Sequence, residues 1–173
     1  PETADTTIWA MMETSRGILN ANAIAGAPRM AGLVLGTNDL GKELNSRTRS
    51  AMTTSLQWCL LAARAHGLVC VDGVYNAFKD EEGLRAECAE GRDFGFDGKT
   101  LIHPAQVAIA NEAFAPSPEE VDLARRQIDA YEAAVREGQG VAVVDGRIVE
   151  NLHVDTARAT LARAEAIAAV EAA

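Results

Sequence analysis

Two carboxylates, Glu13 and Asp39, have the residue type and spacing of a divalent-metal site. Each follows a short apolar segment that reads as a β-strand, one β-α-β repeat apart. Neighbouring strands lie about 4.8 Å apart, so the two carboxylates could converge at one edge of a sheet. Paired carboxylates resist joint ionisation without a cation, and few protein oxygens favour Mg²⁺ over Ca²⁺. The alternative is that Glu13 pairs with an arginine and Asp39 caps the next helix.

The segment directly before Asp39, Gly36-Thr37-Asn38, could hold a substrate beside such a metal. A glycine at a strand end lets backbone N–H groups approach a ligand closely, although the segment could equally be an ordinary turn. His103 is another candidate, as an acid/base group or a metal ligand. The alternative for this histidine, which precedes a proline, is a ring held by backbone hydrogen bonds.

An alternation of apolar strands and helices must position these residues. Strands are expected over 8–14, 32–36, 68–71 and 96–102, and helices over 15–28, 47–66 and 80–92. Continuously apolar strands of this length are typical of a parallel sheet covered on both faces. In such α/β sheets the chemistry lies at the carboxyl ends of the strands. The residues expected at those ends are Glu13, Asn38, Asp39, Asp72 and His103.

The chain changes character near residue 115. Ser117 and Pro118, followed by two acids, are typical of a helix start, and this helix should run to about Glu137. Asp145-Gly146 between two apolar segments predicts a β-hairpin, and an alanine-rich helix is expected over 154–171. We therefore divide the chain into residues 1–115, which carry the parallel sheet, and residues 116–173, a helix-hairpin-helix lid or oligomerisation segment.

Composition narrows the possible partners. The 173 residues have a formal net charge of −9, which argues against nucleic acid or an anionic membrane as the main partner. A hydrophobic fraction of 48% is too high for a disordered chain. No apolar run approaches the ~18 residues that span a bilayer, and a cytoplasmic location is expected. The three cysteines show no metal-ligand spacing, and Cys59 and Cys70 are expected to be buried thiols.

The sequence resembles the citrate lyase β-subunit-like and malyl-CoA lyase group of the HpcH/HpaI aldolase superfamily. The matching stretches are IWAMMETSRGILNANAIA, GLVLGTNDLGKEL, AARAHGLVCVDGVYNAFKDEEGLRAE and GFDGKTLIHPAQVAIANEAFAPSPEEV. The tail GQGVAVVDGRIVENLHVDTARATLARA resembles the C-terminal segment of the same group. The resemblance covers nearly the whole chain, and several motifs agree in order and spacing.

The resemblance implies a fold. The group has a Mg²⁺-dependent TIM (β/α)₈ barrel, and the chain would hold strands five to eight followed by the lid segment. The first four strands have no counterpart in the sequence, and neither does an upstream arginine that grips the substrate in this group. The length of a complete barrel then leads us to expect about 110–130 further residues before this segment.

The resemblance also implies site residues. Glu13 and Asp39 fall on the group's metal-ligating carboxylates, and the backbone of Gly36, Thr37 and Asn38 falls where the carboxylate of a 2-oxo acid binds. CoA lyases of the group borrow an acidic residue from a neighbouring subunit, and Glu150 matches it by position. Many members carry Asp there, with Asp145 and Asp155 as nearby alternates. A borrowed residue implies a homo-oligomer, expected to be a trimer or a hexamer. No residue is assigned to CoA.

From this resemblance we expect a Mg²⁺-dependent acyl-CoA lyase that cleaves or forms a carbon–carbon bond in a compound such as malyl-CoA or citramalyl-CoA. Glu150 would remove a proton from the acyl-CoA, and the enolate would add to a 2-oxo acid bound at the metal. Three other functions stay open. They are an aldolase acting on free hydroxy-oxo acids, a malyl-CoA thioesterase, and a non-catalytic half-barrel assembly module. A flavodoxin-like open sheet is disfavoured because no glycine-rich phosphate loop is evident.

Overall fold

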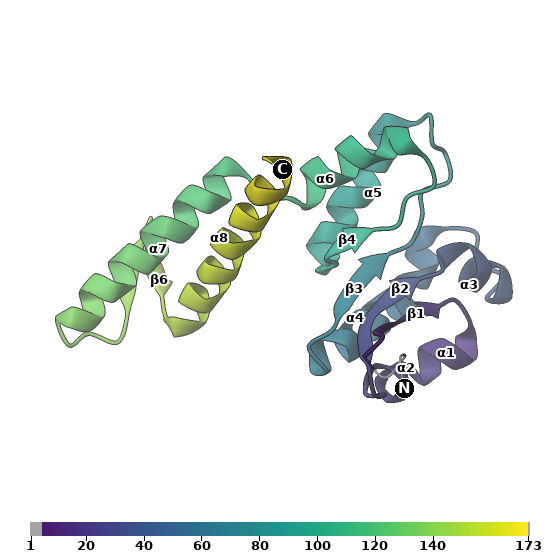
Figure 1. Cartoon of the computed structure of the whole chain (residues 1–173), viewed down its shortest axis with the longest axis horizontal. Coiled ribbons are helices and arrows are strands. Elements are labelled where there is room, and N and C mark those ends of the chain that lie inside the picture. The colour runs from purple at the N-terminus through teal and green to yellow at the C-terminus, as the bar shows by residue number, and fades with distance from the viewer. Residues whose placement is uncertain (1–4, 173) are drawn as a thin grey trace. The chain divides into compact units, whose positions relative to one another are not determined.

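A computed structural model describes residues 5–172 of the chain. The chain forms two compact units, the first ending at Phe114 and the second beginning at Ala115 (Figure 1). Each unit has its own cluster of buried apolar side chains. No helix in the described residues is long and apolar enough to cross a membrane.

The first unit is built on a parallel four-stranded sheet with the order β1-β2-β3-β4. The predicted α/β class and parallel strands are therefore confirmed. Within residues 5–172 the sheet is open, with β1 and β4 at its edges, and does not close into a barrel. The strands are β1 (Ile8–Met12), β2 (Met30–Leu35), β3 (Val69–Asp72) and β4 (Gly98–Lys99).

Strand β4 is much shorter than the expected segment 96–102. The chain turns away after Lys99 into a loop that the buried side chain of Gln106 holds. Its Oε1 accepts a hydrogen bond from Ile102 N (3.0 Å), and its Nε2 donates one to Tyr75 O (2.9 Å). Gln106 thereby ties the loop after β4 to the loop after β3.

The helices of this unit depart from expectation in two places. The helix expected over 15–28 is divided at Asn20, whose φ of −102° and ψ of 13° are not helical. The Asn20 side chain competes with the helix by donating to Arg16 O (2.7 Å). The helices are α1 (Ser15–Leu19), α2 (Ala21–Ala25), α3 (Thr37–Glu43), η1 (Arg49–Met52), α4 (Thr53–Ala65), α5 (Glu81–Phe94), η2 (Pro104–Gln106) and α6 (Val107–Phe114).

Helix α3 was not expected from the sequence, because Asn, Asp and Gly within it have low helix propensity. Packing stabilises it instead, since Leu40 at its centre is fully buried. The helix begins directly after β2, with Gly36 as its N-cap. The residues expected to act at the end of β2 therefore stand in the first turn of a helix.

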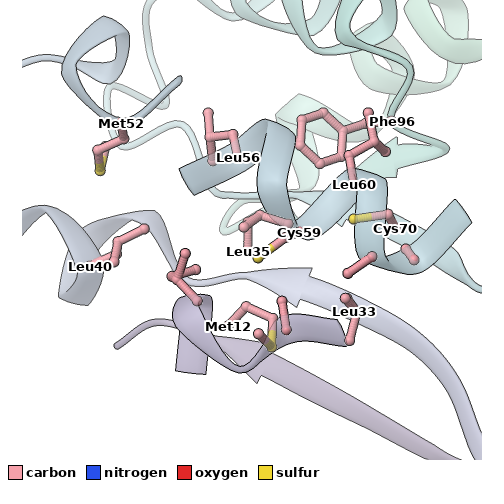
Figure 2. Close-up of a cluster of buried hydrophobic side chains, with 14 of the residues drawn as sticks. Met12, Leu33, Leu35, Leu40, Met52, Leu56, Cys59, Leu60, Cys70 and Phe96 are labelled. Carbon is pink, nitrogen blue, oxygen red and sulfur yellow. The ribbon is translucent and has the colours of Figure 1, made fainter. Parts of the chain in front are cut away.

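The core of the first unit lies between β1–β3 and α4. Figure 2 shows Leu56, Cys59 and Leu60 of α4 on the side of the sheet from which Leu33 and Met12 project. All three cysteines of the chain are buried and free, which confirms the expectation for Cys59 and Cys70. Burial raises the pKa of each of these two thiols to about 12.

One face of β1 is left open by the described residues of the first unit, 5–114. Trp9 is 48% exposed and Met11 is 54% exposed, whereas Met12 on the opposite face is buried. The indole of Trp9 lies over Gly32 of β2, where a Cβ would stand 2.6 Å from Trp9 Cζ3. The expectation that both faces of every strand are covered is therefore not met for β1 within the described part of the first unit, residues 5–114.

The second unit is a helix-hairpin-helix, as expected. Its elements are α7 (Pro118–Arg136), β5 (Ala142–Val144), β6 (Arg147–Val149) and α8 (Asn151–Glu171). Ser117 and Glu120 form a capping box at the start of α7, and the hairpin turns at Asp145 (φ 49°) and Gly146 (φ 74°). Both φ values are positive, which a two-residue hairpin turn of this kind requires.

Candidate functional site

Glu13 directly follows β1, and its side chain lies against the backbone of Gly36 at the end of β2. A Cβ at Gly36 would clash with Glu13 Cβ and would also stand 2.8 Å from Glu13 Oε2. Glycine at position 36 therefore leaves room for the Glu13 side chain. The fold therefore places Glu13 beside the N-terminal end of α3, on the same face of β1 as Trp9 and Met11.

Asp39 lies exposed in the first turn of α3. Across residues 5–172, the structure records no hydrogen bond or ion pair for the carboxylate of either Glu13 or Asp39. The N-cap of α3 is Gly36, so Asp39 does not cap this helix. Among the described residues, Glu13 forms no ion pair with an arginine. Two free carboxylates suit Mg²⁺, which keeps several waters and takes one or two protein carboxylates.

No larger metal-ligating group is present in the described part of the chain. Within residues 5–172 there is no group of three or more His, Cys, Asp or Glu side chains that could hold a metal ion. The candidate metal site therefore consists of Glu13 and Asp39 alone, and metal binding by this pair stays a prediction.

Thr37 and Asn38 hold the start of α3 against β3 and the loop that follows it. Thr37 is buried, and its side chain packs so closely over Gly73 that a Cβ there would clash. Asn38 exchanges two amide hydrogen bonds with Asn76, with N–O distances of 3.1 and 2.7 Å. The structure thus places Gly36, Thr37 and Asn38 together beside Glu13. Binding of a substrate carboxylate there stays a prediction.

The sequence analysis missed a buried ionic cluster at the end of β3. The side chains of Asp72 and Lys99 are fully buried, and that of Arg49 is 15% exposed. Arg49 donates to both carboxylate oxygens of Asp72 at 3.0 Å, and Lys99 Nζ donates to Asp72 Oδ2 at 3.0 Å. No sequence signal could have joined these residues, because the contacts span three separate elements.

Two glutamates of α5 complete this cluster. Lys99 Nζ lies 2.6 Å from Glu87 Oε1, and Arg49 Nε donates to Glu90 Oε2. Burial by itself would lower the pKa of Arg49, but attraction and hydrogen bonds to Asp72, with Glu90 and Glu87, raise it above its usual value. The cluster thereby fixes the guanidinium of Arg49 beside α3.

An open hollow with a volume of about 260 Å³ lies between α3, the segment that follows it and the loop after β3. Polar and charged side chains form much of its lining. They include Asn38, Lys42, Arg47, Arg49, Asn76 and Glu87. The hollow adjoins the start of α3, where the candidate site stands.

Within the described residues, His103 belongs to no group of side chains that could hold a metal ion. Its Nδ1 accepts a hydrogen bond from the backbone N–H of Ala105 at 3.1 Å. Its ring stacks on Phe78, with 4.7 Å between the centroids. The alternative in which backbone hydrogen bonds hold this histidine is the one that the structure supports.

Glu150 belongs to the second unit, where it is exposed and is the N-cap residue of α8. Its backbone N–H donates to His153 Nδ1 at 3.0 Å. The alternates are engaged elsewhere. Both Asp145 oxygens accept from Arg126 Nη1 at 2.9 Å, and Asp155 accepts from Asn151 at 3.2 Å. Unlike these two aspartates, Glu150 accepts no hydrogen bond from another side chain within residues 5–172. Its catalytic role stays a prediction.

Comparison with known proteins places the chain in one family. The family model described as HpcH/HpaI aldolase/citrate lyase matches residues 2–104. A protein of Cereibacter sphaeroides named (3S)-malyl-CoA thioesterase is 70% identical over 171 residues, covering 97% of this chain and 60% of the relative. Citrate lyase subunit beta of Escherichia coli is 40% identical over 169 residues, covering 95% of this chain and 56% of the relative.

A solved structure agrees with these relatives. CitE from Mycobacterium tuberculosis, in complex with magnesium, acetoacetate and coenzyme A, superposes with a TM-score of 0.78 at 31% identity. The match covers 95% of this chain and 63% of that one. The chain thus spans about 60% of the length of the relatives named (3S)-malyl-CoA thioesterase.

These comparisons correct the expectation of a carbon–carbon lyase. Several relatives about 70% identical to the chain are named (3S)-malyl-CoA thioesterase, whereas a citrate lyase subunit is only 40% identical. The expectation rested on motifs that this chain shares both with relatives named as a thioesterase and with a citrate lyase subunit. Such shared motifs do not specify whether a C–C or a C–S bond breaks.

Proposed function

Because the chain belongs to the HpcH/HpaI aldolase/citrate lyase family, we propose that it carries the metal and substrate groups of an enzyme that hydrolyses malyl-CoA. The observation that carries this proposal is the high identity to relatives named (3S)-malyl-CoA thioesterase. In the reaction, water attacks the thioester carbonyl, an acyl C–O bond forms and the acyl C–S bond breaks. Malate leaves, and the CoA sulfur takes up a proton.

Glu13 and Asp39 would hold Mg²⁺ at the carboxyl ends of β1 and β2. The ion would supply Lewis-acid polarisation of the substrate carbonyl. The free state of both carboxylates supports this assignment, as does the glycine that leaves room for Glu13. The backbone N–H groups of Thr37 and Asn38 would bind the malyl carboxylate, because backbone N–H groups at a helix start favour an anion. The N–H of Gly36 instead donates to Met12 O at 3.0 Å, so Gly36 would contribute only the close approach of its backbone.

The first test is an inventory of the products formed from malyl-CoA with Mg²⁺ by the intact source protein. Hydrolysis releases malate and free CoA in equal amounts. Carbon–carbon cleavage would instead release glyoxylate and acetyl-CoA, and their appearance as the main products would refute the proposal. Mass spectrometry distinguishes the two product pairs without relying on a coupled enzyme.

The second test concerns the metal site. Asp39→Asn should weaken Mg²⁺ binding in a calorimetric titration, because it removes one of only two protein carboxylates from the site. Glu43→Gln is the matched control, since Glu43 is an exposed acid of the same helix and lies outside the proposed site. Equal Mg²⁺ affinity in the two variants would exclude Asp39 as a ligand.

We further propose that the four strands are half of a (β/α)₈ barrel. The half-exposed Trp9 and Met11 support it, because the open face of β1 would become the interior of a closed barrel. In the intact protein these two side chains should then be shielded from solvent. Quenching of tryptophan fluorescence by acrylamide measures the exposure of Trp9, and Trp58 on α4 is the other tryptophan that contributes to the signal.

Glu150 is proposed as the acid/base group, donated by a neighbouring subunit of a homo-oligomer. Removal of a general base costs roughly 10²–10⁴-fold in turnover, and Glu150→Gln should lose that much while keeping Mg²⁺ affinity. Mixing Glu150→Gln subunits with Asp39→Asn subunits tests the donation. Hybrid oligomers contain some intact sites and regain activity only if Glu150 acts across subunits. Lack of recovery after subunit exchange would reject the donation.

A further inference from the structure

The hollow beside α3 carries unpaired positive charge in an otherwise acidic chain. Lys42, in the last turn of α3, and Arg47, in the segment after it, both line the hollow and are exposed. For neither side chain does the structure record an ion pair with any residue between 5 and 172. The chain as a whole has a formal net charge of −9, so the positive charge of Lys42 and Arg47 at this hollow is opposite in sign to the charge of the chain.

The other charged residues of the lining do not cancel this charge. Glu87 is the acid of the lining, and its Oε1 lies 2.6 Å from Lys99 Nζ. Arg49 lines the hollow, but its guanidinium is already paired with Asp72 and Glu90, so its charge is not available to a ligand. The charge available to a ligand therefore comes from Lys42 and Arg47.

Uncharged hydrogen-bond donors surround the two cations. The lining includes the hydroxyls of Ser46 and Thr48 and the side-chain amides of Asn38 and Asn76. The two amides are fixed by their mutual hydrogen bonds, so the wall next to the candidate site is preorganised. Cations together with neutral donors around one hollow form a site for an anion with several oxygen acceptors.

We propose that this hollow binds a phosphate group. A phosphate monoester carries about 1.5 to 2 negative charges and three acceptor oxygens, which matches two cations and several neutral donors better than a carboxylate does. The group could be one of the phosphates of coenzyme A or a free phosphate ion. Assignment to a phosphate of coenzyme A rests on the malyl-CoA function proposed above, whereas binding of a free phosphate ion does not, and neither needs turnover to be measured.

Phosphorus NMR of the intact source protein tests the site with two probes, inorganic phosphate and coenzyme A. The phosphorus signals of coenzyme A are distinct, so the one that broadens identifies the bound group. Lys42→Gln and Arg47→Gln should each raise the dissociation constant about tenfold, because each removes a charge-assisted hydrogen bond. Lys42→Arg keeps the charge and should stay within a few-fold of the original value.

Lys79→Gln is the control, since it removes an exposed lysine of the same unit that does not line the hollow. If Lys42→Gln and Arg47→Gln weaken the binding of coenzyme A but not of inorganic phosphate, the site binds a phosphate of coenzyme A. If they weaken the binding of inorganic phosphate but not of coenzyme A, the site binds the free ion. Unchanged binding of both probes in Lys42→Gln and Arg47→Gln would overturn the proposal.

Discussion

Replacing Asp72 by Asn should destabilise the first unit by about 3 kcal/mol or more. The substitution keeps the volume of the side chain, so it creates no cavity. It removes the negative charge that Arg49 and Lys99 share at 3.0 Å, and Lys99 has a fully buried side chain. Breaking a buried ion pair costs about 3–5 kcal/mol, because the remaining charges lose their partner without regaining water. Glu87 and Glu90 keep the expected loss near the lower end of this range.

Urea unfolding followed by tryptophan fluorescence measures this loss. Both tryptophans of the chain, Trp9 and Trp58, belong to the first unit, so the signal reports on that unit. Glu112→Gln is the matched control. It breaks the Arg85–Glu112 pair, whose side chains are 52% and 69% exposed, and should cost less than about 1 kcal/mol.

Two outcomes would refute the reasoning. A loss in Asp72→Asn no larger than that in Glu112→Gln would mean that the buried charges are effectively solvated. The double variant Asp72→Asn with Arg49→Met should lose less stability than the sum of the losses in the two single variants, because it no longer contains the unpaired Arg49 cation. Strict additivity would mean that the contact between Arg49 and Asp72 does not contribute to stability.

Three further predictions concern the site, the core and the second unit. Gly36→Ala should weaken Mg²⁺ binding at least tenfold in a calorimetric titration, because the added Cβ displaces Glu13. Gly98→Ala is the control, since a Cβ there meets no neighbour and should leave the Mg²⁺ affinity unchanged. Equal Mg²⁺ affinities in the two variants would place the metal elsewhere. Cys59 and Cys70 should resist a thiol reagent at pH 8 until the protein unfolds, since burial raises each pKa to about 12. Because free thiols ionise near pH 8.5, these two groups should also make stability fall as pH rises from about 8.5 to 12, and a flat urea midpoint over that range would contradict this. Ser117→Ala should cost about 1 kcal/mol and speed hydrogen exchange at Glu120 N, which donates to Ser117 Oγ at 3.2 Å; unchanged exchange would show that the cap is not needed.

Local signals in the sequence predicted much of the fold. Ser117 with Glu120, and Asp145 with Gly146, act through their own backbone and near neighbours, so their capping box and hairpin turn could be read directly. Continuous apolar runs located the parallel strands and placed Glu13 at a strand end. Helix α3 was not among the predicted elements, and it forms because the packing of the buried Leu40 overrides the low helix propensity of its Asn, Asp and Gly residues.

The sequence by itself determined the α/β class, the strand order along the chain and the two carboxylates that follow β1 and β2. Only the tertiary structure decided that Glu13 and Asp39 have no hydrogen-bond or ion-pair partner within residues 5–172. It alone brought Asp72, Arg49 and Lys99 into one buried cluster and left Lys42 and Arg47 beside a hollow. The physical reason is that backbone conformation follows from neighbouring residues, whereas the partners of a charged side chain depend on elements that meet only after the chain has folded.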